Sequence, residues 1–322
     1  MRPRLEHACK TLAALPLIIA VHGCNLAREP EPPETQLKVI TTVLPVTLFT
    51  EAVAGSCAVV TTLLPAGADP HAFQARPGDI DKLRQADVLV INGLGLEQFL
   101  KPLLEGAENP ALAVIDSSAG IKPLPLGPSA GDSHHRSHHL DEHGDDAETA
   151  VDPHVWLDPR LAMQQVQTIR DALVEADPSC QEGYRARARA YLASLEDLDR
   201  DLAEQLKPFF GRHVVGFHDV LAYFARRYNL NNEALVALPE DQPTPGDLQR
   251  ISGVLRNEQV HGVLSEPGGG TAALNALAAD LDLKVEVFDP LELVPAGEQP
   301  DPALYGRVMR SNGTAVAATL QP

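Results

Sequence analysis

The sequence has few aromatic residues and few positive charges. Phe, Trp and Tyr make up 4% of the 322 residues, and 26 lysines and arginines stand against 44 aspartates and glutamates, a formal net charge of −18. A surface of this sign repels nucleic acid and attracts cations. We therefore expect no nucleic-acid partner, and the charge serves either cation binding or solubility alone.

Catalytic signatures are also absent. The chain contains no H-E-x-x-H zinc-protease motif, and no motif for a serine or cysteine nucleophile stands out. We therefore expect a binding protein and not an enzyme. A secreted zinc hydrolase is the alternative: it would need an open metal position with a general base nearby, and a turnover screen would detect it.

The apolar stretch nearest the N-terminus, residues 11–21, is too short to span a bilayer as a stable helix. It follows a basic segment, which is the pattern of a secretory signal, predicted here over residues 1–23. The signal ends in Val-His-Gly-Cys, which resembles a bacterial lipoprotein cleavage site, so we expect cleavage before Cys24 and its acylation. The protein would then be exported to the periplasm or cell surface and anchored to a membrane. Residues 24–37, rich in Pro and Glu, would form a flexible tether.

Cysteine is scarce, with four residues in the whole chain. Once Cys9 and Cys24 are set aside, Cys57 and Cys180 remain. Export permits a disulfide between them, but their spacing matches neither a zinc knuckle nor a redox pair. We predict no functional role for either residue.

Runs rich in Val, Ile and Leu alternate with segments of helical spacing in both halves of the chain. The expected strands are residues 38–44, 58–64, 87–92, 111–115, 213–217, 234–238, 260–265 and 284–288. Such alternation predicts, in each half, a mostly parallel sheet flanked by helices. The last helix is expected from about residue 302 to Asn312.

A long amphipathic helix is predicted between the two sets of strands. From Cys180 to about Leu206, apolar residues recur at steps of three and four with charges between them. We therefore predict an α/β protein of two lobes, with an N-terminal lobe at residues 38–176, a linking helix at 177–207 and a C-terminal lobe at 208–322.

Residues 120–150 break the alternation. This stretch is rich in acidic residues, Pro and Gly, and it contains five histidines: His134, His135, His138, His139 and His143. It has too few apolar residues to pack, so we predict a disordered, solvent-facing loop. Imidazoles and carboxylates in such a chain can collect divalent metal ions weakly; an inert polar insertion is the alternative.

Three isolated histidines share a setting. His71 and His154 each follow an Asp-Pro pair, and His218 follows a predicted strand directly. Proline fixes φ and biases the residue before it toward extended geometry, so each Asp-Pro-His turn presents its imidazole from a stiff segment. Any one of these could be an ordinary turn histidine. Their repetition suggests that the three meet on one metal ion.

Acidic residues mark the ends of two further strands. Glu266 and Asp289 follow predicted strands, as His71 and His218 do. In open α/β sheets, ligands bind beyond the carboxyl ends of the strands. With His71 and His154 in the first lobe, and His218 and Asp289 in the second, we expect the site in the cleft between the lobes.

These motifs, in this order, resemble those of the metal-binding lipoproteins of zinc and manganese ABC importers. They are Asp69-Pro70-His71, Asp152-Pro153-His154, Phe217-His218-Asp219, Glu266-Pro267 and Phe288-Asp289-Pro290. The resemblance runs from about residue 38 to the end. It implies that His71, His154, His218 and Asp289 coordinate the metal; Glu266 and Asp219 are candidates for supporting these ligands.

The same resemblance implies a function. Its members capture a metal ion outside the cytoplasm and deliver it to the membrane subunits of an ABC permease, and the His-rich stretch is similar to that of the zinc-specific members. Three imidazoles and one carboxylate suit Zn2+, whereas Mn2+ favours more oxygen donors. We expect a monomeric zinc-binding protein. A manganese or iron carrier of the same class, or a surface lipoprotein with an adhesin role, are the alternatives.

Overall fold

The computed structural model describes residues 36–126, 151–237, 242–267, 271–293 and 301–321. The predicted signal sequence, Cys24 and nearly all of the predicted tether lie outside these ranges. The five histidines of the predicted collecting loop, His134, His135, His138, His139 and His143, lie outside them as well. Within the described ranges, no helix combines the length and the apolar character that a membrane span requires.

The first lobe is built on a parallel sheet of four strands, β1 (Leu37–Thr41), β2 (Ala58–Thr62), β3 (Val88–Ile91) and β4 (Ala113–Asp116). The order is β2-β1-β3-β4, and the register pairs Val39 with Val60 and with Val88. Because the order turns at β1 and β3, the carboxyl ends of these strands open onto a crevice where ligands commonly bind. The sheet confirms the parallel arrangement that the sequence predicts.

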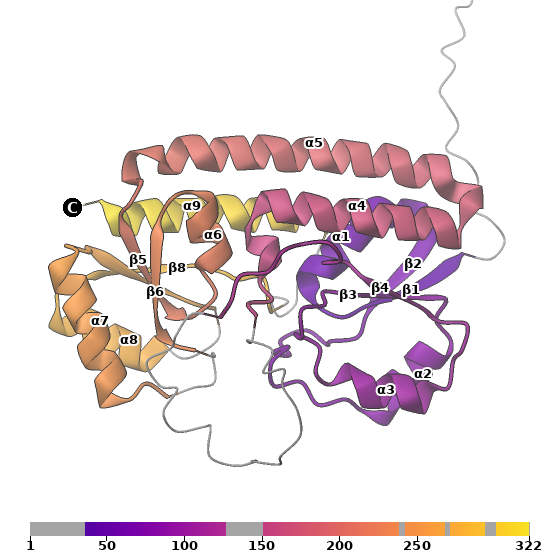
Figure 1. Cartoon of the computed structure of the whole chain (residues 1–322), viewed down its shortest axis with the longest axis horizontal. Coiled ribbons are helices and arrows are strands. Elements are labelled where there is room, and N and C mark those ends of the chain that lie inside the picture. The colour runs from indigo at the N-terminus through magenta and orange to yellow at the C-terminus, as the bar shows by residue number, and fades with distance from the viewer. Residues whose placement is uncertain (1–35, 127–150, 238–241, 268–270, 294–300, 322) are drawn as a thin grey trace, which may run out of the picture. The chain divides into compact units, whose positions relative to one another are not determined.

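Helices cover both faces of the first sheet. They are α1 (Leu44–Ala54), α2 (Pro77–Arg84), α3 (Leu100–Ala107) and α4 (Pro159–Ala176). Figure 1 shows α2 and α3 on one face, with α1 and α4 on the other. Helix α1 begins at Leu44, within the stretch 38–44 that was expected to be a strand, and β1 ends earlier, at Thr41. Pro45 therefore lies in the first helical turn, where its missing N–H costs nothing.

The second lobe repeats this arrangement. Its parallel strands are β5 (His213–His218), β6 (Asn231–Val236), β7 (Gly262–Ser265) and β8 (Lys284–Val287), in the order β6-β5-β7-β8. The helices are α6 (Ala222–Arg227), α7 (Pro245–Asn257), α8 (Thr271–Asp280) and α9 (Leu304–Leu320). In Figure 1, α7 and α8 lie on one face of the sheet, with α6 and α9 on the other.

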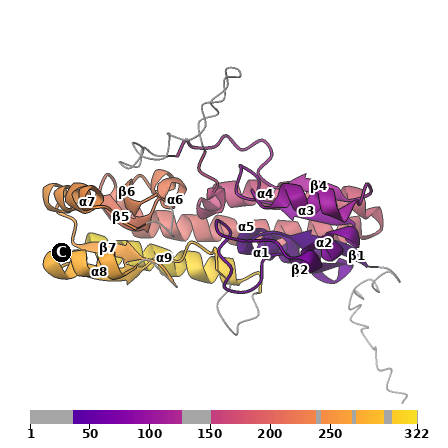
Figure 2. The same cartoon turned by 90° about the horizontal axis from the view of Figure 1, so that it is seen from below.

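Helix α5 (Gln181–Leu206) connects the lobes, which belong to one compact unit. It packs against α1 and α4 of the first lobe and α9 of the second, and Figures 1 and 2 show it running alongside both. Its buried stripe includes Tyr184, Leu195 and Leu202, as the apolar spacing predicts. The main core is continuous through it: Leu48 of α1, Leu198 of α5 and Tyr305 of α9 belong to one buried cluster.

Short 3-10 turns complete the chain path at Gly55–Cys57, Val155–Leu157, Pro178–Cys180 and Lys207–Phe209. The first and third of these carry the disulfide Cys57–Cys180, which joins residues 123 positions apart. Next to it, Arg187 of α5 donates hydrogen bonds to the carbonyl oxygens of Val53 and Ala54 at the end of α1. The start of α5 is therefore fixed to the first lobe.

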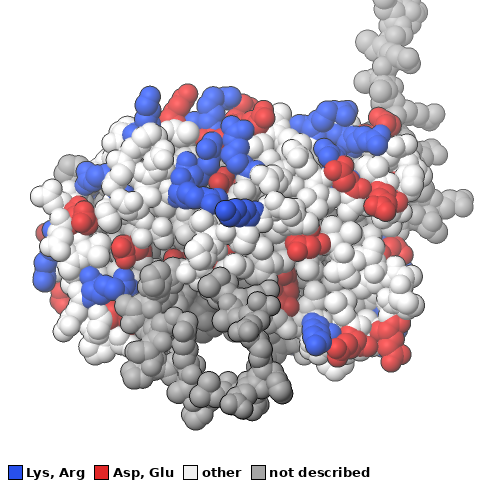
Figure 3. Space-filling view, viewed as in Figure 1, with Lys and Arg blue, Asp and Glu red and all other residues white. Residues whose placement is uncertain are grey.

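A charged cluster fixes the middle of α5 to both lobes. The carboxylate of Asp199, whose side chain is 2% exposed, accepts hydrogen bonds from Arg160 of α4 at 2.7 Å and from Arg227 of α6 at 2.7 and 2.6 Å. These bonds lower the pKa of Asp199, although burial alone would raise it. In Figure 3, basic side chains gather where α4, α5 and α6 meet.

The last helix is longer than predicted. The sequence predicted an end at about Asn312, but α9 continues to Leu320. Gly313 lies against Leu202 of α5, where a Cβ atom would collide with the leucine. Asn312 is buried; its side-chain oxygen accepts from the backbone N–H of Asp289 and its amide donates to the Asp289 carbonyl, both at 2.8 Å. These two residues serve packing and loop anchoring instead of ending the helix.

Candidate metal centre

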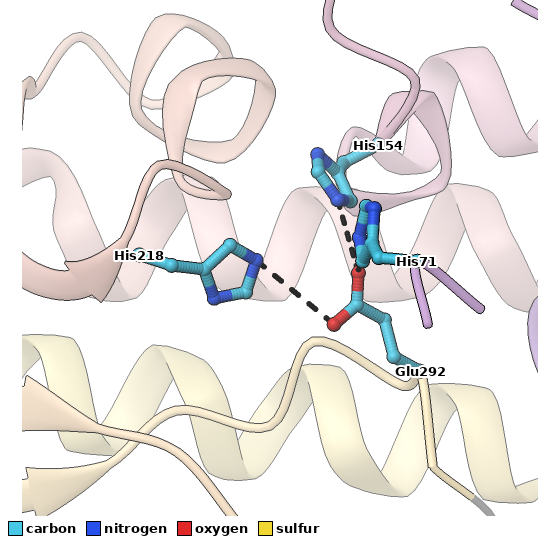
Figure 4. Close-up of side chains that lie close together, drawn as sticks. All are labelled: His71, His154, His218 and Glu292. Atoms are coloured by element: carbon cyan, nitrogen blue, oxygen red, sulfur yellow. Dashed lines mark hydrogen bonds and ion pairs between the residues drawn. The ribbon is translucent and has the colours of Figure 1, made fainter. Parts of the chain in front are cut away.

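The three histidines singled out in the sequence come together in the structure, with Glu292 among them. One ligand atom from each of His71, His154, His218 and Glu292 lies within 4.8 Å of all the others. Figure 4 shows the three imidazoles and the carboxylate directed at a common point. His71 and His154 belong to the first lobe, His218 and Glu292 to the second, so residues of both lobes form the group.

The two Asp-Pro-His segments adopt the same turn. The backbone N–H of His71 donates to Asp69 Oδ1 at 2.8 Å, and the backbone N–H of His154 donates to Asp152 Oδ1 at 2.9 Å. In each turn the aspartate closes a small ring with the backbone two residues on, and proline stiffens the chain between them. Both imidazoles therefore project from rigid local structures.

Each buried histidine has a carboxylate behind it. Nδ1–H of His154 donates to Asp152 Oδ1 at 2.7 Å, and Nδ1–H of His218 donates to Glu266 Oε2 at 2.6 Å. This contact fixes the ring and leaves Nε2 facing the common point, as carboxylates behind metal-binding histidines commonly do. Glu266 thus lies where a supporting residue is expected. Asp219 does not join the group; its Oδ1 accepts from Asn232 at 3.5 Å.

His218 Nε2 is the atom that most directly marks a binding site. It is buried and has no hydrogen-bond partner among the described residues, and it lies 3.9 Å from Glu292 Oε2, beyond hydrogen-bond distance. A buried polar atom without a partner is unfavourable by about 1–3 kcal/mol, so such atoms call for an explanation. A cation bound between His218 and the other three residues supplies one.

The fourth member of the group is Glu292, not Asp289 as we expected. Glu292 is buried, and its Oε1 lies 3.1 Å from His71 Nε2 and 3.0 Å from His154 Nε2. Asp289 is used locally: its Oδ1 accepts from the backbone N–H of Leu291 at 2.8 Å. Leu291 has a left-handed backbone, with φ of 62°, and the chain turns there before Glu292.

The sequence contains only a weak signal for Glu292. It is a second carboxylate three residues beyond Asp289, within the segment that follows β8. A left-handed conformation is uncommon for any residue other than glycine, and leucine gives no sign of it. The sequence therefore pointed to Asp289, the acid nearest the strand end. The turn at Leu291 instead brings Glu292 to the histidines.

The electrostatics of the group favour a positive charge at its centre. Burial alone would lower the pKa of His154, but the carboxylates of Asp152 and Glu292 outweigh it and raise that pKa to about 10. The pKa of His218 is raised by Glu266 and Glu292 against the same opposing effect of burial. Burial alone would raise the pKa of Glu292, whereas its bonds to His154 and His71 lower it. Without a metal, the charge of the buried Glu292 carboxylate is balanced by a proton on the His154 imidazole.

Three imidazole nitrogens and one carboxylate oxygen form a donor set suited to a borderline-soft divalent cation in four-coordinate geometry. They are carried by two α/β lobes joined by a long helix. Fold and group together define the class as a two-lobed metal-binding protein.

Comparison with known families identifies the class further. Residues 39–319 match the family described as zinc-uptake complex component A, periplasmic, and the chain belongs to this family. The family match begins within β1 and covers the rest of both sheets, the linking helix and all four residues of the group.

Similar proteins include one named for zinc binding and one named for manganese binding. The chain is 27% identical over 285 residues to the zinc-binding protein AdcA of Streptococcus pyogenes, covering 87% of this chain and 55% of AdcA. It is 28% identical over 290 residues to the manganese-binding lipoprotein MntA of Halalkalibacterium halodurans, covering 88% of this chain and 90% of MntA. The chain thus spans about half the length of the AdcA relatives.

A solved structure shows the same fold. The crystal structure of ZnuA superimposes with a TM-score of 0.76 at 29% identity, covering 89% of this chain and all of that one. The arrangement of two parallel sheets joined by a long helix is therefore shared.

Proposed function

We propose that this protein captures Zn2+ outside the cytoplasm and delivers it to an ABC-type membrane permease. The single observation that carries the proposal is the group of three histidines and one glutamate, of which His154, His218 and Glu292 are buried and His218 Nε2 has no partner among the described residues. Membership of the zinc-uptake family and the zinc-binding name of a relative support it.

In this proposal, His71, His154, His218 and Glu292 hold the ion. Three nitrogens and one oxygen complete a tetrahedral shell at about 2.0–2.2 Å from zinc. Manganese is the competing cargo, because MntA is named for it. Mn2+ prefers oxygen donors and a higher coordination number than these four residues offer. Zinc is therefore expected to bind in preference to manganese.

Transport fits the group better than catalysis does. A catalytic zinc site keeps one coordination position open for water or substrate, whereas a closed site fills all four with protein atoms. Here Glu292 supplies the fourth donor, and its carboxylate is already paired with two of the histidines. We therefore propose binding without turnover. A hydrolase screen on the zinc-loaded protein tests this, and activity that depends on the metal would contradict it.

The main test is a metal competition on the purified mature protein. We expect one tightly bound zinc per chain, retained against Mn2+ and Fe2+ in excess, and lost in the double variant His71→Ala/His218→Ala. His213→Ala is the matched control, because His213 lies on the same strand as His218 but outside the group. A preference for Mn2+ or Fe2+ would change the cargo, and no tight site in the wild type would overturn the proposal.

Delivery and location need separate tests. We propose that cleavage before Cys24 and acylation of its thiol anchor the protein to a membrane, and that the monomer docks on the permease. Mass spectrometry of membrane fractions should find a lipid-modified Cys24; an unmodified cysteine would contradict the anchor. Cells lacking the protein should take up zinc poorly at low external zinc, with rescue by the wild type and not by the double variant.

A further inference from the structure

The loop that carries His154 is held by both lobes. Within this His154 loop (residues 152–156), the carbonyl of Pro153 accepts from Asn92 of the first lobe at 3.0 Å. The carbonyl of Asp152 accepts from the Tyr223 hydroxyl of the second lobe at 2.8 Å. The carbonyl of Trp156 accepts from the Tyr305 hydroxyl, also of the second lobe, at 2.6 Å.

Trp156 adds a side-chain bond of a different kind. Its indole Nε1–H donates to the carbonyl of Pro290 at 2.8 Å, across 134 residues of sequence. Pro290 belongs to the Glu292 loop (residues 289–292), so this bond joins the segments that carry His154 and Glu292. Trp156 is fully buried and is the sole tryptophan of the chain. Its ring packs edge to face against the His154 ring, with 5.3 Å between the ring centroids. The Trp156 side chain therefore contacts His154 directly and also bonds to the loop that carries Glu292.

The Glu292 loop depends on such support. Asn312 holds the loop at its first residue through two bonds to Asp289. Beyond that point the chain turns through the left-handed Leu291, a conformation that costs about 1 kcal/mol or more for a residue other than glycine. The Trp156 bond to buried Pro290 lies between this anchor and the turn. It restrains the part of the loop from which the Glu292 carboxylate projects.

We propose that Trp156 is a positioning residue that fixes Glu292 relative to His154 and thereby sets how tightly the metal is held. The proposal rests on the proposed function, since it concerns the same site. Metal ligands must be held to within about 0.5 Å to act together, and the residues that hold them carry much of the affinity. Without the indole N–H, the Pro290 carbonyl is left buried without its donor, and the carboxylate is free to shift away from the histidines.

The test compares two losses of a side-chain hydrogen bond to a backbone carbonyl. Trp156→Phe removes the bond to the Glu292 loop, whereas Tyr191→Phe removes a bond from α5 to the carbonyl of Pro302 and touches neither the Glu292 loop nor the His154 loop. By competition with a zinc-chelating dye, Trp156→Phe should lose about tenfold in zinc affinity, and Tyr191→Phe less than about twofold. Melting of the metal-free proteins serves as the structural readout, which both variants should lower. Equal affinity losses in the two variants would overturn the proposal.

A double-mutant cycle shows whether the effect passes through Glu292. If it does, Trp156→Phe should change zinc affinity by less than about twofold in the Glu292→Gln background. The same tenfold loss in both backgrounds would contradict positioning. Since phenylalanine also leaves a gap, a second variant with 3-benzothienylalanine at position 156 keeps the ring volume and removes only the N–H donor. It should reproduce the loss.

The outcomes separate this inference from the function. If the wild type binds zinc tightly and both position-156 variants bind it with the same affinity, Trp156 has no positioning role, and the zinc function is unaffected. A wild-type protein without tight zinc would overturn the function and, with it, the role of Trp156.

Discussion

His154 Nε2 lies 3.0 Å from Glu292 Oε1, although the two residues are 138 positions apart in the chain. Each residue comes from a different lobe, and each is buried. In the metal-free protein, a proton on the imidazole holds the two together. A divalent cation placed between them replaces that proton and satisfies both.

Glu292 should matter far more for zinc than Asp289. Glu292→Gln keeps the size of the side chain and removes its charge, so zinc affinity should fall by about tenfold or more. Asp289→Asn is the matched control; it keeps the oxygen that accepts from Leu291 and should change affinity by less than about twofold. Isothermal calorimetry of both variants checks this, and the reverse order would restore Asp289 as the ligand.

Replacing His218 by glutamate should shift metal preference. His218→Glu adds an oxygen donor beside Glu266 and Glu292, which suits Mn2+ and weakens zinc by about tenfold or more. His71→Ala and His154→Ala should weaken both metals without that shift. Competition titrations with Zn2+ and Mn2+ measure the ratio directly. An unchanged ratio in His218→Glu would mean that His218 does not bind the metal.

Zinc binding at neutral pH should release protons. Because the pKa of His154 is raised to about 10, its imidazole is protonated at pH 7 and must lose that proton to coordinate zinc. Calorimetry at pH 7 in two buffers of different ionisation enthalpy should detect the release of about one proton or more. Apparent zinc affinity should therefore rise from pH 6 to pH 9. Heats that do not depend on the buffer would contradict this.

The stability of the metal-free protein should fall over the pH range in which zinc affinity rises. Folding raises the pKa of His154, so this residue stabilises the folded protein fully below its unfolded pKa of about 6.5, and the stabilisation is lost as the pH rises toward 10. Folding lowers the pKa of Glu292, so this residue stabilises the folded protein fully above its unfolded pKa of about 4.3, and the stabilisation is lost as the pH falls below that value. Melting of the metal-free protein should thus peak between these pH values, and Glu292→Gln should flatten the peak.

Asp199 should stabilise the joint between the lobes. Asp199→Asn leaves Arg160 and Arg227 without their shared carboxylate, and the free energy of unfolding should fall by about 2 kcal/mol at neutral pH. Since the pKa of Asp199 is lowered, the difference from the wild type should shrink as the pH falls below about 4. Asp197→Asn, an exposed acid on the same helix, is the control. Urea unfolding at several pH values measures both.

Deleting residues 132–148 should leave one tight zinc site. The four residues of the metal group lie outside that interval, so only weak sites contributed by the histidine-rich stretch should disappear. Calorimetry of the deletion variant should show a single binding event of unchanged affinity. Loss of the tight site would make His134 or its neighbours principal ligands.

Local chemistry explains what the sequence could predict. The parallel strands follow from short apolar runs, and the Asp-Pro-His turns identify His71 and His154 because their geometry is set by adjacent residues. The strand end identifies His218. Each of these signals lies within a few positions of the residue it marks, so no knowledge of tertiary contacts was needed.

Contacts between distant segments explain what the sequence could not predict. Glu292 reaches the site through the turn at Leu291, held by Asn312 from α9 and by Trp156 from the first lobe. The length of α9 likewise depends on packing against α5 at Gly313. Composition and periodicity do not encode these partners, so the sequence did not indicate Glu292 as a member of the group, and it placed the end of the last helix too early.

The wide separation of the site residues has a consequence for synthesis. His71 and Glu292 are 221 positions apart, and they meet only when both sheets are in place. A chain that is still incomplete, or one cut by a protease inside this interval and separated, lacks part of the ligand set. We expect such copies to hold zinc poorly. Tight metal binding would then require that the whole interval between His71 and Glu292 has been made and folded.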